Sequence, residues 1–493
     1  MVTYANAMGK QLRAHQPASV PTNVATPAKP QAALIPQYIP GEDITTIESD
    51  GIRLEIGRSS ASVRSVELKK FHNISTGTPL RFGNGSPTLS TIISHDNSTW
   101  IEESRSNHAI SFRKAITQDL DAKLAISIGN HEQTYSLNAE LQNRSAANAE
   151  TPISLVSSWH RGDSASGRSN LLEAVLNTKK QHGWERQYLS YRYVGANPQY
   201  VPRGTTMMTL SERFFCQAVK PSDTHNSSTI LPSQQDLASA SLDSLISVPA
   251  HGTASYSAEV YVGPRDFFIL RQAGFEQAFP IGFLGKIGLI LVLFLKGIAS
   301  VVRNYGAAIV LLSAIVTTAF SPFTIISFRS MKKMQELQPK IEQLKKKYEK
   351  DPSKMNQETM ALFREHKVSP LSGCLPMVIQ MPIFFALWSA ISHVIEFRGE
   401  RFLWIKDLSL PDRLAKLPLG FDLNLLPILM AIAMYAQTKL TQQKTATAGT
   451  LSMLSGPIMP IMFGVMFYSV PSSLVLYWLT NTAISVISYR LIK

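Results

Sequence analysis

The stretch Ser369–Ile395 reads SPLSGCLPMVIQMPIFFALWSAISHVI and is apolar enough to lie in a lipid bilayer. Within it, however, are an amide, Gln380, and two prolines, Pro376 and Pro382. Polar side chains are costly where a membrane helix faces lipid, so they usually face a bundle interior or a water-filled cavity. Prolines in such a helix produce kinks. We therefore expect a membrane helix that turns Gln380 toward other helices.

Further uncharged runs lie on both sides of this stretch. The four runs are Asn304–Phe328, Val368–Ile395, Leu423–Thr438 and Thr445–Tyr489. About 20 residues cross the hydrocarbon layer, so the last run, which has Pro471 in its middle, has room for two helices. Helices satisfy their own backbone groups in lipid. The runs therefore predict a polytopic α-helical membrane protein with a five-helix core over 301–493.

The segment 329–367, between the first two spans, predicts a water-exposed helical hairpin. Its apolar residues from Met334 to Tyr348 recur at spacings of three and four, and Lys350-Asp351-Pro352-Ser353 breaks the pattern. Its 11 Lys and Arg place it in the cytoplasm by the positive-inside rule. The region 41–270 then lies outside and the C-terminus inside. Five Lys and Arg in the outer loop 396–422 conflict with this orientation, but the hairpin carries the denser charge.

The region 271–300 contains the apolar run IGFLGKIGLILVLFLKGIASVV. Lys286 and Lys296 leave only nine residues between them, too few to cross the hydrocarbon layer. We expect an amphipathic helix at the membrane interface, with lysines that reach toward water. The alternative is that this run forms the start of the next span.

The region 41–270 predicts an all-β sandwich. HAISFRKAIT and AISIGNHEQTYSLNAELQN, which begin at His108 and Ala125, alternate apolar and polar residues, and turn signals such as Gly129-Asn130 separate the runs. Residues 1–40 are a Pro/Ala-rich linker without an apolar segment. Since an outer domain must be exported, we expect a membrane anchor upstream of Met1.

Polar side chains within the spans predict a mildly polar, uncharged cavity. The candidates are Ser313, Thr317, Thr318, Gln380, Gln437, Tyr477, Trp478, Asn481 and Ser485. A single Ser or Thr in a membrane helix usually bonds the carbonyl four residues back, and Trp478 can be an interfacial anchor. For Gln380, Tyr477 and Asn481 as a set, we expect a cavity.

Signatures of enzymes and of bound cofactors are missing from the sequence. HEQTY at His131 lacks the second histidine of a zinc-protease helix, and GFLGKIG does not match a phosphate-binding loop. Cys216 and Cys374 show no zinc-ligand spacing. The net charge of +13 favours a membrane surface over nucleic acid, because the basic residues crowd beside apolar runs. We expect no catalytic residues, no metal and no cofactor.

Four segments resemble the YidC/Oxa/Alb family of membrane protein insertases. They are MKKMQELQPKIEQLKKKY from Met331, HKVSPLSGCLPMVIQMPIFFALW from His366, NLLPILMAIAMYAQTK from Asn424 and VPSSLVLYWLTNT from Val470. The layout resembles the Gram-negative type, which implies a periplasmic super-sandwich before a five-helix insertase core. The resemblance implies insertion of newly made proteins into the bacterial inner membrane, alone or with the Sec translocon and without ATP, through a hydrophilic groove closed to the outside. The basic hairpin would contact substrate, with the ribosome as a further candidate partner, through Lys332, Lys333, Lys345, Lys346 and Lys347.

The chain departs from the family at one position. The family usually has a lone arginine in the groove on the first span, and the matching residue here is Thr317. We hypothesise that this groove works by hydration alone. Two other readings stay open: a small-solute or ion transporter, which would need intramembrane charges or paired half-helices, and a structural assembly factor of a translocon complex.

Overall fold

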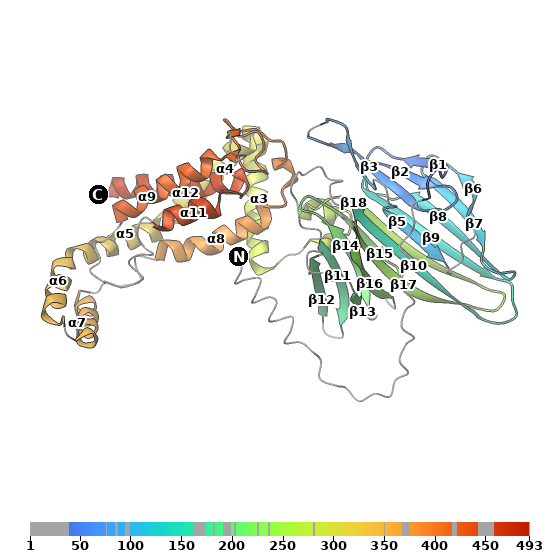
Figure 1. Ribbon diagram of the computed structural model, residues 1–493, viewed down its shortest axis with the longest axis horizontal. Helices are drawn as coiled ribbons and strands as arrows, with labels where there is room; N and C mark the ends of the chain where they lie inside the picture. The colour runs from blue at the N-terminus through green and yellow to red at the C-terminus, as the bar shows by residue number, and fades with distance from the viewer. Residues whose placement is uncertain are drawn as a thin grey trace, which may run out of the picture. The chain divides into compact units, whose positions relative to one another are not determined.

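The computed structural model (Figure 1) describes residues 39–493. Within that range it leaves out 75, 84–86, 94–98, 161–172, 181–182, 191–198, 202–203, 224–225, 235–236, 280–281, 350, 367–374, 417–421, 442–457 and 493. The predicted linker 1–40 therefore lies outside the described residues except for its last two positions. The strands come first along the chain, and the helices follow them.

Two antiparallel sheets, each of nine described strands, form the N-terminal part. The first sheet has the order β1-β2-β3-β5-β10-β17-β16-β13, with β4 paired to β3, and the second has the order β12-β11-β14-β15-β18-β9-β8-β7-β6. The strands of the first sheet are β1 Ile44–Glu48, β2 Ile52–Gly57, β3 Val63–His72, β4 Pro79–Phe82, β5 Leu89–Ile93, β10 Ala149–His160, β13 Gln199–Val201, β16 Ser227–Gln234 and β17 Leu237–Val248. Those of the second are β6 Ile101–Arg105, β7 Ala109–Ala115, β8 Leu120–Ile128, β9 Thr134–Asn143, β11 Glu173–Lys180, β12 Gly183–Ser190, β14 Thr205–Ser211, β15 Phe215–Pro221 and β18 Thr253–Pro264.

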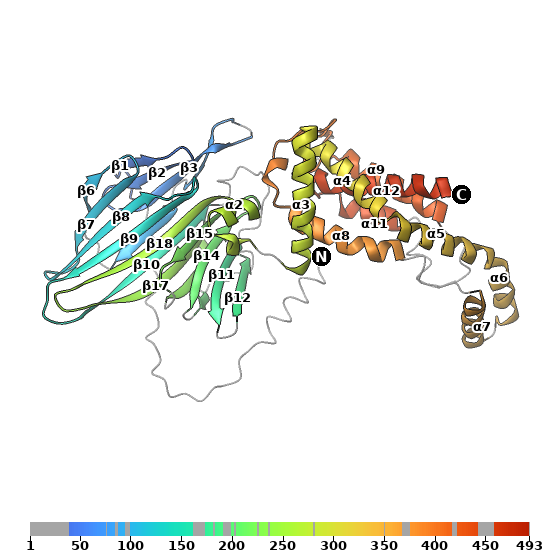
Figure 2. The same ribbon diagram turned by 180° about the vertical axis from the view of Figure 1, so that it is seen from behind.

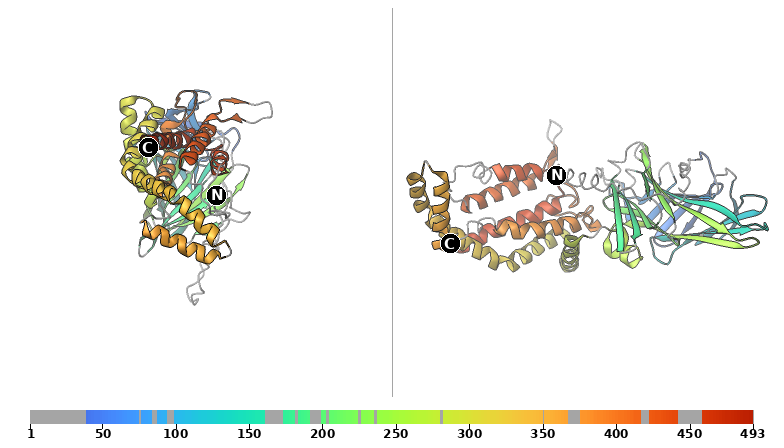
Figure 3. Two further views of the ribbon diagram at one scale, coloured as in Figure 1. Left: turned by 90° about the vertical axis from the view of Figure 1, so that its left-hand side faces the viewer. Right: turned by 90° about the horizontal axis from the view of Figure 1, so that it is seen from below.

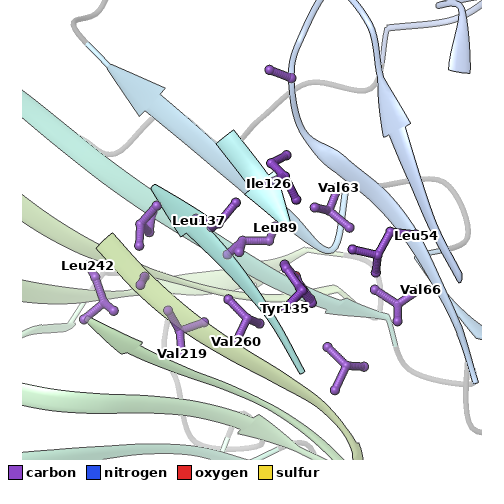
Figure 4. Packing of buried hydrophobic residues seen from close by; sticks show 14 of the residues in the cluster. Leu54, Val63, Val66, Leu89, Ile126, Tyr135, Leu137, Val219, Leu242 and Val260 are labelled. Carbon is purple, nitrogen blue, oxygen red and sulfur yellow. The ribbon is translucent and has the colours of Figure 1, made fainter. Parts of the chain in front are cut away.

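Alternation along the strands places one face of each sheet in a shared core. In β9, buried and exposed side chains alternate from Leu137 to Asn143, as expected for a strand with one solvent-exposed face. Figure 4 shows Leu54 and Leu89 of the first sheet near Tyr135 and Val260 of the second. The all-β prediction for this region is confirmed.

Short helices connect the strands to the helical part. After β18 come the helix α2 Phe267–Gln272 and the 3-10 turn η1 Glu276–Ala278, and then the 20-residue helix α3 Phe283–Val302. Among the described residues, α3 is the one helix that is long and apolar enough to cross a membrane, and α4 and α9 are shorter apolar helices. Whether α3 lies at an interface, as its lysines suggest, stays a prediction.

The C-terminal part is helical. Its elements are α4 Tyr305–Ala319, α5 Ser321–Glu336, α6 Gln338–Lys347, α7 Pro352–Glu365, α8 Leu375–Ile391, η3 Ile395–Phe397, β19 Ala415–Lys416, β20 Asp422–Leu423, α9 Leu425–Thr441, α11 Ile458–Met466 and α12 Ser472–Ile492. Helix α12 packs against α4 and α9, while α3 packs against α4 and α8. In Figures 1 and 2, α3 stands upright beside the ends of α8 and α12, which run sideways, and Figure 3 shows the helical part from two further sides.

The first uncharged run differs from its predicted form as one span. It divides at Phe320, the C-terminal cap of α4, and α5 begins with Ser321 and Pro322. Pro322 has no N–H to bond the carbonyl of Thr318, so the regular hydrogen-bond pattern is interrupted there. The result is a 15-residue α4, and an α5 that continues into the charged segment.

The predicted helical hairpin is present in the described residues. Asp351 caps α7 through a hydrogen bond from the N–H of Lys354 at 3.0 Å, and Pro352 occupies the first position of that helix. Leu337 is buried, with Ile341 and Phe363 packed against it. The break at Asp351-Pro352 therefore lies where the sequence predicts it.

Candidate functional site in the helical core

Four neutral polar side chains from three helices form one hydrogen-bonded group. Gln380 of α8 donates from Nε2 to the hydroxyl of Tyr477 in α12 at 3.0 Å. Asn481 of α12 donates from Nδ2 to Thr317 Oγ1 of α4 at 2.8 Å, and the same nitrogen lies 3.4 Å from Gln380 Oε1. Thr317 in turn donates to the carbonyl of Ser313 at 2.7 Å. We call Thr317, Gln380, Tyr477 and Asn481 the polar cluster.

Helix periodicity positions each member of the polar cluster. Tyr477 and Asn481 are four residues apart and therefore share one face of α12. Helix α4 packs against α12, which brings Thr317 to Asn481. Gln380 lies two residues before Pro382, a proline inside α8. The cluster is thus a product of packing between helices that are distant in sequence.

The polar cluster contains hydrogen-bonding groups but no formal charge. Tyr477 is only 1% exposed, whereas Thr317, Gln380 and Asn481 are half-buried. The two amides each carry donors and an acceptor. They can therefore exchange their present partners for water or for polar groups of another chain.

Four other predicted site residues are not members of the polar cluster. Ser313 is fully buried and donates to the carbonyl of Ile309 at 2.7 Å, and Ser485 donates to that of Asn481 at 2.9 Å. Both bonds follow the common pattern to the carbonyl four residues back. Thr318 is exposed, and Gln437 is half-buried on α9.

Trp478 belongs to an aromatic group beside the polar cluster. Its ring centroid lies 4.7 Å from that of Phe384, and it also contacts Phe463 and Phe467. Phe384 follows Gln380 by four residues in α8, and Trp478 follows Tyr477 directly. Aromatic pairs of this kind contribute about 0.5–1.5 kcal/mol each beyond their buried area. They hold α8, α11 and α12 together next to the polar side chains.

A group of charged residues was missed by the sequence analysis. Lys296 Nζ of α3 lies 2.9 Å from Asp266 Oδ2 and 2.8 Å from Glu396 Oε1. We call these three residues the ion cluster. Its lysine pairs with carboxylates instead of reaching toward water as expected. No local signal could have revealed this, because the partners are 30 and 100 positions away in the chain.

The hairpin lysines are distributed along α5 and α6. Lys333, Lys346 and Lys347 are exposed, Lys345 is half-buried, and the side chain of Lys332 lies outside the described part. Three of them, Lys345–Lys347, form the last turn of α6, where cations interact favourably with the helix dipole. In the described residues, no group of three or more His, Cys, Asp or Glu could hold a metal ion.

Comparisons with known proteins place the helical part in a family. The sequence model described as "60Kd inner membrane protein" matches residues 297–493. A "Membrane protein insertase YidC" of Syntrophobacter fumaroxidans is 41% identical over 243 residues, which cover 48% of this chain and 43% of that protein. One of the same name from Geobacter sulfurreducens is 35% identical over 286 residues, covering 56% and 51%.

The chain spans about half the length of these relatives. Among solved structures, one described as "Active YidC insertase crystal structure with the first transmembrane domain resolved" aligns over 90% of this chain and 94% of that one. The two are 20% identical and the TM-score is 0.39. Residues 297–493 therefore match a family described as inner membrane proteins, and relatives that are 41% and 35% identical over about half of this chain are named YidC insertases.

Proposed function

We propose that the protein is a membrane protein insertase, which helps newly made proteins enter the inner membrane of a bacterium. The observation that carries this proposal is the polar cluster, where three apolar helices present amides and hydroxyls to one another. Relatives named insertases match about half of this chain, and the matching family model covers this helical region. The polar cluster is the proposed wall of a hydrophilic groove that receives the polar tail of a substrate.

The physical advantage of such a groove is a lower cost of moving polar groups into the bilayer. An amide or hydroxyl without a hydrogen-bond partner costs roughly 2–7 kcal/mol in an apolar environment. Water and the amides of Gln380 and Asn481 would supply partners part of the way across. Apolar segments of the substrate would then move sideways into lipid, driven by the hydrophobic effect. This step requires no nucleotide.

Thr317 makes the proposed groove neutral. Its hydroxyl accepts from Asn481 at the position where the family usually carries arginine. A neutral groove attracts water without favouring acidic substrate tails. We therefore propose that this groove acts by hydration and does not select substrates by their charge.

The proposed topology is that of a multi-pass protein with a five-helix core. In it, the β domain lies in the periplasm, and the hairpin α6–α7 and the C-terminus lie in the cytoplasm. The exposed lysines of the hairpin support this orientation. Proposed partners are nascent membrane proteins, the Sec translocon and, at the hairpin, the ribosome.

Site-specific photo-crosslinking to a stalled nascent membrane protein tests the proposal. A crosslinker replacing Gln380 should react with the nascent chain. The matched control is Ile432, which is 59% exposed on α9 and lies outside the polar cluster. Equal crosslinking from both positions, or none from Gln380, would contradict the groove.

Two other functions make different predictions. A transporter of small solutes or ions should produce flux in protein-containing liposomes, which an insertase should not. A structural assembly factor should leave insertion of a Sec-independent substrate unchanged when it is depleted. The neutral composition of the polar cluster favours the insertase over an ion pathway.

A further inference from the structure

An apolar groove lies between α3 and α4, away from the polar cluster. Its volume is about 650 Å³, within the range of about 300–1,000 Å³ that is typical of ligand pockets. The lining residues are Ile290, Leu293, Phe294, Gly297, Ile298, Val301, Val302, Leu311 and Ile315. Several of them are strongly exposed, including Phe294 at 63% and Val301 at 81%. The two helices meet at Arg303, and Figure 2 shows the angle between them.

Gly297 is exposed in this groove, and its missing side chain leaves open space, which we call the hole. A Cβ added at Gly297 would meet no atom within 4 Å, although glycine is disfavoured in a helix interior relative to alanine. The residues one turn away on either side, Leu293 and Val301, are large. Close packing of a second membrane helix usually uses small residues at this spacing. The hole therefore suits a narrow flexible chain better than a helix.

Arg303 is the basic residue next to the groove in the chain. It directly follows Val302, the last residue of α3, and is exposed. Its backbone is held in the left-handed region, with φ of 56°. A guanidinium recognises phosphate oxygens through paired hydrogen bonds. The groove thus has an apolar lining, and an exposed basic residue directly follows its lining residue Val302.

We propose that this groove binds one phospholipid, with an acyl chain over Gly297 and the headgroup phosphate at Arg303. The apolar lining and the hole match a hydrocarbon chain, and the guanidinium matches the phosphate. The site is distinct from the proposed substrate groove, because its lining contains none of the residues of the polar cluster. A lipid at this position would brace α3 against α4 without taking part in insertion.

Native mass spectrometry of the full chain, released from nanodiscs of phosphatidylglycerol, tests the proposal. We expect one retained lipid per chain. Gly297→Leu should reduce the retained fraction about tenfold by filling the hole, and Gly297→Ala should reduce it less. Gly282→Leu is the matched control, because Gly282 also has open space around it but lies outside the groove.

The headgroup contact is tested by a second pair of variants. Arg303→Gln should lower lipid retention about fivefold, while Lys286→Gln, which removes an exposed charge near the other end of α3, should not. In phosphatidylcholine nanodiscs the lipid should still be retained, since it also carries a phosphate. Thermal unfolding confirms that each variant is folded.

Three results would overturn the proposal. One is unchanged retention in Gly297→Leu, and another is equal loss in Gly282→Leu, which would indicate non-specific annular lipid. The third is a dimer of the wild-type chain that dissociates in Gly297→Leu, which would mean that a helix occupies the groove. Loss of crosslinking at Gln380 would leave the lipid site unaffected, so the two proposals fail separately.

Discussion

The polar cluster and the ion cluster both pair polar side chains from distant segments, but one does so with neutral groups and the other with charged groups. Both bring these side chains together in a partly buried position. The polar cluster, within the apolar helices, uses only amides and hydroxyls, whereas the ion cluster joins Lys296 to two carboxylates where α3 meets α2 and the turn after α8. Ionic groups need paired partners or water to offset desolvation. Among these two clusters, formal charge occurs only in the one that lies where α3 meets α2 and the turn after α8.

The largest expected effect comes from breaking the ion cluster. Lys296→Ala would leave Asp266, whose side chain is only 5% exposed, without its cation. We expect the free energy of unfolding to fall by about 2–3 kcal/mol. This is below the range for fully buried pairs, because Lys296 and Glu396 retain some solvent access. Thermal unfolding of the purified protein measures it. The control is Lys286→Ala, and equal melting temperatures for the two variants would show that the ion cluster is energetically unimportant.

Placing a charge in the polar cluster tests its neutrality. Thr317→Arg should raise insertion of a substrate with an acidic tail about fivefold relative to one with a neutral tail, since an attraction of about 1 kcal/mol is expected even in a hydrated site. Insertion of the neutral substrate should change less. Protease protection in proteoliposomes measures both, with Thr318→Arg as the control on an exposed neighbour. If the wild-type protein fails to insert the neutral substrate, the hydration hypothesis is wrong.

Removing one amide tests the hydrogen bonds of the polar cluster. Gln380→Leu deletes the donor to Tyr477 and the acceptor for Asn481. Each such bond between membrane helices contributes about 0.6 kcal/mol, so the stability loss should be about 1 kcal/mol. Insertion of a substrate with a polar tail should fall by a larger factor than the loss of folded protein explains. A parallel decline of insertion and melting temperature across Gln380→Leu and Gln380→Met would point to a structural role alone.

The smallest expected effect concerns a carboxylate of the β domain. Burial by itself raises the pKa of Glu42. Hydrogen bonds from Ser59 and Ser60 and the charge of Arg64 lower it, and because their combined effect is larger, the pKa lies below the ordinary 4.5. The stabilisation by Glu42 is therefore present above its unfolded pKa and is lost as the pH falls through the folded one. The difference in melting temperature between wild type and Glu42→Gln should shrink below pH 4.5. A difference that is constant with pH would contradict this coupling.

Local patterns predicted much of the fold. Alternating residues gave the strands β8 and β9, and Gly129-Asn130 lies in the turn between them. Asp351-Pro352 marked the start of α7, and Pro471 directly precedes α12. These features depend on contacts within a few residues, so the order of residue types is sufficient to predict them.

The candidate site was predicted in part. Gln380, Tyr477 and Asn481 were expected to share a cavity, because an amide or phenol in an apolar helix requires a partner. The structure joins them by hydrogen bonds to one another and to Thr317, which was also a candidate, and the cavity stays a prediction. It places Trp478 instead among aromatic rings. Two adjacent residues of a helix point about 100° apart, and which direction meets polar groups depends on the neighbouring helices.

Sequence alone determined the alternating strands of the β part, the break before α7 and the uncharged character of the apolar runs, since each follows from local periodicity and side-chain chemistry. The division between α4 and α5 was not predicted. The tertiary structure alone decided which polar groups meet. Asp412 lies 13 and 14 positions before Leu425 and Leu426, and it accepts hydrogen bonds from their N–H groups at the start of α9. Lys296 pairs with carboxylates that are still farther away in the chain. Such pairs are set by how helices and loops pack, and no local spacing encodes that packing.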